Sequence, residues 1–187
     1  MKRDDDIDID IDIDIDGELL LALVDPIEPS AALQVALLGA VQESAWWAPF
    51  ARRVASLCDV SHGAARALLA TLDDESRWQE GPADGVRLFH IDAGPRLIGA
   101  IAGFVRIDPG AAFPAHTHLG PEEVLVLRGS FVNEDGGVVA VGAEAPRPAG
   151  SRHEVRAGPE GCLYLGIVDT GMEFAPGVVI GPDDPRA

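Results

Sequence analysis

Short segments rich in Val, Leu and Ile, separated by Gly, Pro and Asp, run through the second half of this chain. Segments of this kind predict β-strands, and an Asp-Gly pair at 135–136 adds a hairpin signal. Many strands at this spacing are typical of a β-sandwich or a β-barrel. The expected strands are Gly85–Asp92, Leu97–Asp108, Glu122–Val132, Gly136–Val141, Arg152–Ala157 and Cys162–Val168.

A helical pattern precedes these strands, over residues 18–75. Leu and Val recur at helical spacing in Ser30–Val41, where Ser30 is a candidate N-cap. Ala48–Val60 is amphipathic, with its Arg residues on the face opposite the apolar one. Ser61 is the candidate cap of a further helix, which we expect to run from His62 to Leu72.

The chain opens with a low-complexity repeat of alternating Asp and Ile, DDDIDIDIDIDIDG. If this repeat became a strand, its Ile side chains would share one face and its Asp side chains the other. Three interpretations compete. A solvated, disordered tail is favoured over a strand added to a sheet edge, which includes the edge of a dimer partner. A calcium-binding Asp face is the least favoured, because nothing closes a coordination loop.

These patterns divide the chain into an acidic Asp/Ile tail (1–17), a helical N-terminal segment (18–80) and a β-barrel domain (81–187). The total of 187 residues fits one domain of ordinary size plus an appendage. A chain of this length can bury a sizeable core.

Charge and cysteine content narrow the functional classes. The formal net charge is −17, and the chain after the repeat is acidic by itself, which argues against nucleic acid as a partner. Cys58 and Cys162 fall in different expected elements without a Cys-x-x-Cys motif, so a reducing cytosol is favoured over a disulfide. No apolar run is long enough to span a membrane, and the N-terminus lacks the apolar core of a signal peptide. We therefore expect a cytoplasmic protein.

Candidate chemistry is concentrated in one stretch, GAAFPAHTHLGPEEVLVLRG, which holds His116, His118 and Glu122. A strand puts residues i and i+2 on the same face, so the two imidazoles can converge on one point. Glu122 follows after a short turn and can bring a carboxylate to the same point. His153, further along the chain, offers a third imidazole. Such a set of donors suits Zn, Fe, Mn or Ni.

A hydrogen-bonded structural network is the alternative interpretation of these side chains. The chain has only five His, and three of them belong to this one set, which favours metal binding. Glu123 competes with Glu122 for the role of ligand. Neighbouring residues on a strand point to opposite faces, so only one of them can serve, and the spacing favours Glu122.

These residues resemble the two motifs of the cupin superfamily. Its first motif, G-x5-H-x-H-x3-4-E-x6-G, is filled at every position from Gly110 to Gly129. Its second, G-x5-P-x-G-x2-H-x3-N, is filled from Gly142 to His153, but Ala157 stands at the final Asn position. The resemblance implies a mainly β fold, the cupin double-stranded β-helix or jelly-roll barrel, behind an N-terminal helical segment.

The same resemblance implies four protein ligands for a divalent transition metal, His116, His118, Glu122 and His153, with a water or a substrate completing the shell. Zinc is the favoured metal, and iron, manganese and nickel are the alternatives.

A narrower resemblance covers about residues 45–175 and points to the ChrR-type group. These are anti-sigma factors that join an N-terminal helical sigma-binding domain to a C-terminal metal-binding cupin. Members that hold a sigma factor use a zinc-binding His-x3-Cys-x2-Cys helix, and this sequence has no such motif, since Cys58 and His62 stand alone.

Three functions share this site. The favoured one is a regulatory or sensory metal-binding cupin, with a sigma factor or a small-molecule ligand as its partner. The alternative is a small metal-dependent enzyme, an oxygenase or lyase acting on a small carbonyl compound, although no catalytic residue outside the metal set is evident. A metal-stabilised structural protein is the weakest of the three. We also expect a homodimer, because cupins of this size commonly pair through sheet edges or swapped N-terminal strands.

Overall fold

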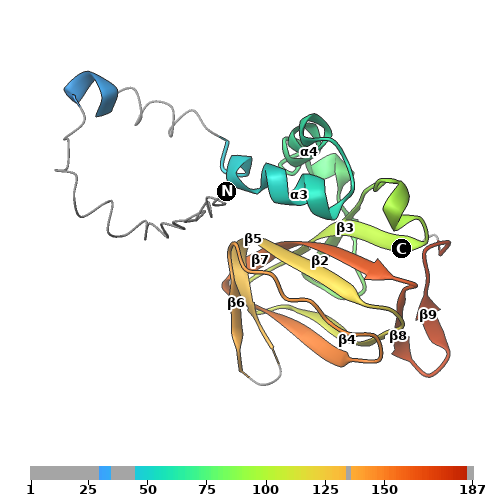
Figure 1. The fold of residues 1–187 in the computed structure, drawn as a ribbon. Coiled ribbons are helices and arrows are strands. Elements are labelled where there is room, and N and C mark those ends of the chain that lie inside the picture. The colour runs from blue at the N-terminus through green and yellow to red at the C-terminus, as the bar shows by residue number, and fades with distance from the viewer. Residues whose placement is uncertain (1–29, 35–44, 134–135, 185–187) are drawn as a thin grey trace, which may run out of the picture. The chain divides into compact units, whose positions relative to one another are not determined.

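The computed structural model describes residues 30–34, 45–133 and 136–184 (Figure 1). The chain divides into two compact units, Met1–Glu43 and Ser44–Ala187. In the first unit, 31–34 is helical and the Oγ of Ser30 accepts a hydrogen bond from the Leu33 amide at 3.2 Å, as expected of an N-cap. The Asp/Ile repeat and the rest of the expected helix to Val41 lie outside the described residues.

Helices open the second unit. Their bounds are η1 Ala48–Phe50, α3 Ala51–Leu57, α4 His62–Leu69, η2 Glu75–Arg77 and η3 Pro95–Leu97. Ser61 caps α4, because its Oγ accepts a hydrogen bond from the Ala64 amide at 3.1 Å. Both helices end about one turn earlier than the sequence pattern predicts. After α3 the chain turns at Asp59, whose φ of 55° is incompatible with a continued helix. None of the helices in the described part is long and apolar enough to cross a membrane.

The strands form one antiparallel sheet in the order β1-β2-β3-β7-β4-β8-β9, and β5 pairs with β7 and with β6. The sheet curls, as Figure 1 shows, so that β4 faces the layer of β2 and β3. The mainly β fold class predicted from the sequence is confirmed. The strand bounds are β1 Gln79–Glu80, β2 Val86–His90, β3 Ala100–Ile107, β4 Ala112–His118, β5 Glu122–Val132, β6 Val138–Ala140, β7 Arg152–Asp169, β8 Met172–Ala175 and β9 Val178–Ile180.

Strand β7 is the long central element of the sheet. The sequence pattern predicts two strands here, Arg152–Ala157 and Cys162–Val168, but the structure joins them into one. The chain bends without breaking because Gly161 has a φ of +78° and its carbonyl packs against Gly129, where a Cβ would come within 2.1 Å of the Gly161 oxygen. One continuous strand therefore pairs with β3 at its C-terminal end and with β4 at its N-terminal end.

Alternate residues of β7 face two different cores. Leu163, Leu165 and Ile167 belong to a core shared with α3 and α4, whereas Cys162 and Tyr164 belong to the core inside the curled sheet. The helices thus cover the outer face of the sheet, and the inner face is left to build the site. The domain limits 1–17, 18–80 and 81–187 stay predictions.

Candidate metal centre

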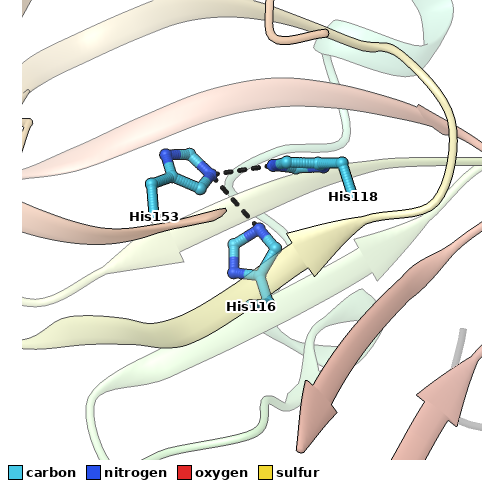
Figure 2. A group of neighbouring side chains, drawn as sticks. All are labelled: His116, His118 and His153. Atoms are coloured by element: carbon cyan, nitrogen blue, oxygen red, sulfur yellow. Dashed lines mark hydrogen bonds between the residues drawn. The ribbon is translucent and has the colours of Figure 1, made fainter. Parts of the chain in front are cut away.

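Strands β4 and β7 place three imidazoles together on the inner face of the sheet. His116 and His118 are two residues apart on β4 and share a face, as the sequence predicts. His153 on β7 lies opposite His116 in the antiparallel register. Figure 2 shows the three rings pointing toward one another from these two strands. All three side chains are buried.

The Nε2 atoms of the three rings converge on one point. His153 Nε2 lies 2.9 Å from His118 Nε2 and 3.2 Å from His116 Nε2. Metal–nitrogen bonds of about 2.0–2.1 Å hold two nitrogens of one ion about 2.8–3.4 Å apart, for angles at the ion between about 90° and the tetrahedral value. The spacing is therefore that of donors sharing a cation.

Hydrogen bonding alone does not satisfy this cluster. His116 Nδ1 donates to the Pro114 carbonyl at 2.8 Å, which leaves the Nε2 of a neutral ring with a free lone pair. His153 Nε2 carries at most one proton, so it cannot donate along both of its short contacts. A cation bound by three lone pairs removes this conflict, and the His116–Pro114 hydrogen bond orients the ring as outer partners of metal ligands do.

Glu122 begins β5 and lies beside the imidazoles. Its Oε2 is 3.4 Å from His118 Nε2 and 3.8 Å from His153 Nε2. Glu122 is buried and Glu123 is exposed, as expected of opposite faces of a strand. Two backbone hydrogen bonds to Arg147, both 2.9 Å, fix the start of β5. The group of donor atoms that all lie within 4.8 Å of one another comprises the three histidines, with Glu122 next to it.

Burial controls the protonation of these groups. It lowers the pKa of His118 to about 4 and that of His153 to about 3, and the nearby His116 adds to both shifts. It also lowers the pKa of His116. The rings are therefore neutral at neutral pH, the form that binds a metal. Burial raises the pKa of Glu122 to about 8, and a bound cation would bring it down again.

Several buried atoms of the site lack a hydrogen-bond partner within the described residues: Glu122 Oε2, His118 Nδ1 and His153 Nδ1. A buried carboxylate oxygen without a partner is costly, and this one lies against two imidazoles. Three neutral imidazoles and one carboxylate fit a divalent transition metal. These side chains therefore fit the divalent metal that the cupin resemblance implies.

No second cluster of metal-binding type occurs in the described residues. Cys58 is fully buried in the core between helices and sheet, and burial raises the pKa of its thiol to about 12. His62 is exposed at the start of α4. The two therefore do not form a site.

A cavity of about 580 Å³ adjoins His116 of the cluster. His116 and Glu122 contribute to its wall, together with Tyr164 of β7 and the C-terminal hairpin β8–β9. Sequence reasoning missed both: the hairpin is too short to show a clear alternation, and Tyr164 looks like an ordinary core residue. The signal that could have identified Tyr164 is its position two residues from Gly166, which places both on the inner face of β7.

Comparison with known proteins agrees with this geometry. A family model described as the ChrR cupin-like domain matches residues 66–169. The structure of Rhodobacter sphaeroides SigE in complex with the anti-sigma ChrR is similar at 25% identity and a TM-score of 0.52, over 82% of this chain and 74% of that one.

Two further solved structures share the fold. An acetylacetone dioxygenase from Acinetobacter johnsonii is 15% identical with a TM-score of 0.50, over 58% of this chain and 81% of that one. A putative acetylacetone dioxygenase from Methylibium petroleiphilum PM1 is 22% identical with a TM-score of 0.50, over 58% and 85%. At these identities the similarity bears on the fold alone. No curated protein matches the chain.

Proposed function

The chain belongs to the ChrR cupin-like domain family, and from that premise we propose that it is a regulatory or sensory cupin holding a divalent metal ion on His116, His118, Glu122 and His153. The convergence of three buried Nε2 atoms carries this proposal. The unpartnered Oε2 of Glu122 beside them supports the fourth ligand.

Each residue has a distinct task in this arrangement. The three histidines supply neutral nitrogen donors, and Pro114 fixes the ring of His116 through its carbonyl. Glu122 supplies one negative charge, which offsets part of the charge of a divalent ion in a buried site. A bound ion would act there as a Lewis acid toward a small ligand or toward water.

Zinc is the metal that we propose first. Three imidazoles and a carboxylate are ordinary zinc ligands, and zinc can expand to a fifth position for a water or a ligand, while iron, manganese and nickel accept the same donors. The cavity reaches His116, so a ligand could approach the ion from that side. This access is what a sensor of small molecules requires.

The protein partner that we propose is a sigma factor. The support is the similarity to ChrR in complex with SigE, which extends over most of this chain. Since Cys58 is a buried thiol and the His-x3-Cys-x2-Cys motif is absent from the sequence, such contact would not use zinc in the helical segment. Co-purification with SigE and with sigma factors of the organism that encodes this chain tests the idea. A stable complex with at least one of them is expected, and the absence of any complex would contradict it.

A metal-dependent enzyme is the second candidate. One observation favours it: the cavity beside His116 is large enough for a substrate. Metal identity separates the two functions. Zinc that stays bound through purification, with no turnover, supports the sensor. Bound Fe(II), with oxygen uptake in the presence of a small diketone, supports the enzyme and contradicts the regulatory proposal.

A further inference from the structure

The wall of the cavity beside the histidines is mainly apolar. Strands β2 and β3 contribute Leu88, Ile101 and Val105, and β4, β8 and β9 contribute Phe113, Phe174 and Ile180. The volume of about 580 Å³ lies in the range of pockets that enclose small organic ligands. A ligand that fills it must therefore present a mostly apolar body.

Apart from the ion proposed on His116 and Glu122, this wall carries no positive charge. None of the described residues that line the cavity is Lys or Arg. The positive charge of Arg147 lowers the pKa of Glu122, but Arg147 does not line the cavity. Its guanidinium donates a hydrogen bond to the Asn133 side chain. The carboxyl groups that line it belong to Glu80 and Glu122. Away from the proposed metal centre, an anionic group would lose its hydration without gaining a cationic side chain.

Hydrogen-bonding groups are also few. Apart from the imidazoles of His90 and His116, Tyr164 is the one described lining residue with an uncharged hydrogen-bond donor in its side chain. A sugar would leave most of its hydroxyls unpaired here, at a cost for each one. The polar groups His116 and Glu122 lie at the proposed metal centre, at one end of the cavity. A ligand can therefore place one polar atom at that end, while the rest of its body lies against apolar side chains.

We propose that this cavity binds a neutral, predominantly apolar molecule that carries one oxygen donor at the end facing His116 and Glu122. Only the placement of that oxygen rests on the proposed metal function. The apolar, cation-free wall supports the remainder independently.

Glycines on two neighbouring, paired strands provide the space. Gly103 of β3 pairs with Gly166 of β7, and both line the cavity. A Cβ on Gly166 would meet only the Tyr164 ring at 3.4 Å and Glu122 Oε1 at 4.0 Å, so a side chain there fits the backbone and fills cavity space. Gly166→Leu should therefore block the ligand, whereas Gly166→Ala should be tolerated.

The hairpin offers a matched pair of positions. Val178 lines the cavity, and its neighbour Val179 does not. Both are about half exposed, at 45% and 42%, so both accept a larger side chain without disturbing a core. Val178→Trp should narrow the cavity, and Val179→Trp serves as its control. This pair keeps the proposal testable if Gly166→Leu fails to fold.

The experiment uses the neutral fluorophore N-phenyl-1-naphthylamine on the purified full chain, with metal content measured in each sample. The parent should bind the fluorophore, and 2-nonanone should displace it from the cavity. In protein stripped of metal, where no ion can bind its carboxylate, 8-oxononanoate, the same ketone with a carboxylate at its far end, should compete about tenfold more weakly or worse. Gly166→Leu and Val178→Trp should each bind the fluorophore about tenfold more weakly, Val178→Trp with unchanged metal, while Val179→Trp should match the parent.

Equal competition by the ketone and the keto acid would overturn the proposal, as would parental binding in both cavity-filling variants. A parent that carries no metal but keeps the preference for the neutral ketone would overturn the proposed function instead and leave the apolar cavity assignment standing.

Discussion

His116 on β4 lies opposite His153 on β7 in the antiparallel register, and their Nε2 atoms are 3.2 Å apart. Two residues 37 positions apart in sequence therefore depend on one strand pairing for their approach. Because a one-residue slip of that pairing would send one ring to the opposite face, the register itself is part of the site.

Glu122→Gln should weaken metal binding about tenfold or more, because the amide lacks the negative charge of the carboxylate. Titration of the metal-free protein with Zn²⁺ against a competing chelator measures the effect. Glu123→Gln is the matched control, since Glu123 is exposed on the opposite face. Equal weakening by both changes would show that Glu122 is not a ligand.

The metal-free protein should lose stability as the pH rises from about 5 to 8 through ionisation of Glu122. Its pKa is about 8 in the folded state, above the ordinary value of 4.5, so the folded state holds the proton more tightly. That stabilisation is complete below the unfolded pKa and is lost as the pH passes the folded pKa. Glu122→Gln removes the effect.

Thermal unfolding of the metal-free parent and Glu122→Gln at both pH values checks this. The difference between the two melting temperatures isolates Glu122 from the imidazoles, whose lowered pKa values act at acid pH. A difference that stays constant from pH 5 to 8 would contradict the prediction.

Metal should stabilise the fold. A ligand at about one hundred times its Kd adds about 2.7 kcal/mol to the free energy of unfolding. For a chain of this size that corresponds to a rise of roughly 5–10 °C in Tm. Calorimetry before and after removal of metal with a chelator tests this, and full return of Tm on adding metal back is expected. An unchanged Tm would indicate that the folded state does not bind the ion preferentially.

Two glycines of the cupin motifs should differ in their tolerance of alanine. A Cβ on Gly129 would lie 2.1 Å from the Gly161 oxygen, and its φ is +63°. Gly142 has a φ of +83° but nothing within 4 Å of its Cβ. We expect Gly142→Ala to cost about 1 kcal/mol for conformational strain alone and Gly129→Ala to cost clearly more. Urea unfolding compares them, and equal costs would argue against the close approach of β5 and β7.

Neither cysteine should react in the folded protein. Burial raises the pKa of both Cys58 and Cys162 to about 12, so the reactive thiolate is scarce at pH 8. Ellman's reagent should titrate almost no thiol in the native chain and both thiols in denaturant. Rapid modification of the native protein would contradict this and would reopen a thiol-based sensing role.

The expected homodimer stays a prediction. Light scattering coupled to gel filtration compares the mass in solution with the 19.6 kDa of one chain. A monomer at micromolar concentration would contradict it.

Much of this fold is readable from local sequence. Strand β5 has the bounds that the sequence predicts, because its apolar run ends in clear turns. The His-x-His spacing predicted two histidines of the cluster from strand geometry alone, and the second motif supplied His153. The joining of β7 was not predictable, because Gly158 and Gly161 normally indicate a turn. Their close contacts are with residues distant in sequence: Ser130 and Gly129 of β5 and Ile107 of β3.

The cavity lay further beyond sequence reasoning. Its wall comes from strands distant in the chain, and the role of Gly166 depends on what faces it across the sheet. Periodicity assigns a residue to a face but does not say whether that face is filled or hollow.

Elemental analysis of the purified protein tests the central claim most directly. The parent should contain close to one equivalent of a transition metal, and His116→Ala and His153→Ala should lose most of it. His62→Ala, changed at an exposed position on α4, should keep the parental content. Equal metal in all four proteins, or none in a folded parent supplied with zinc, would contradict a metal centre built on these histidines.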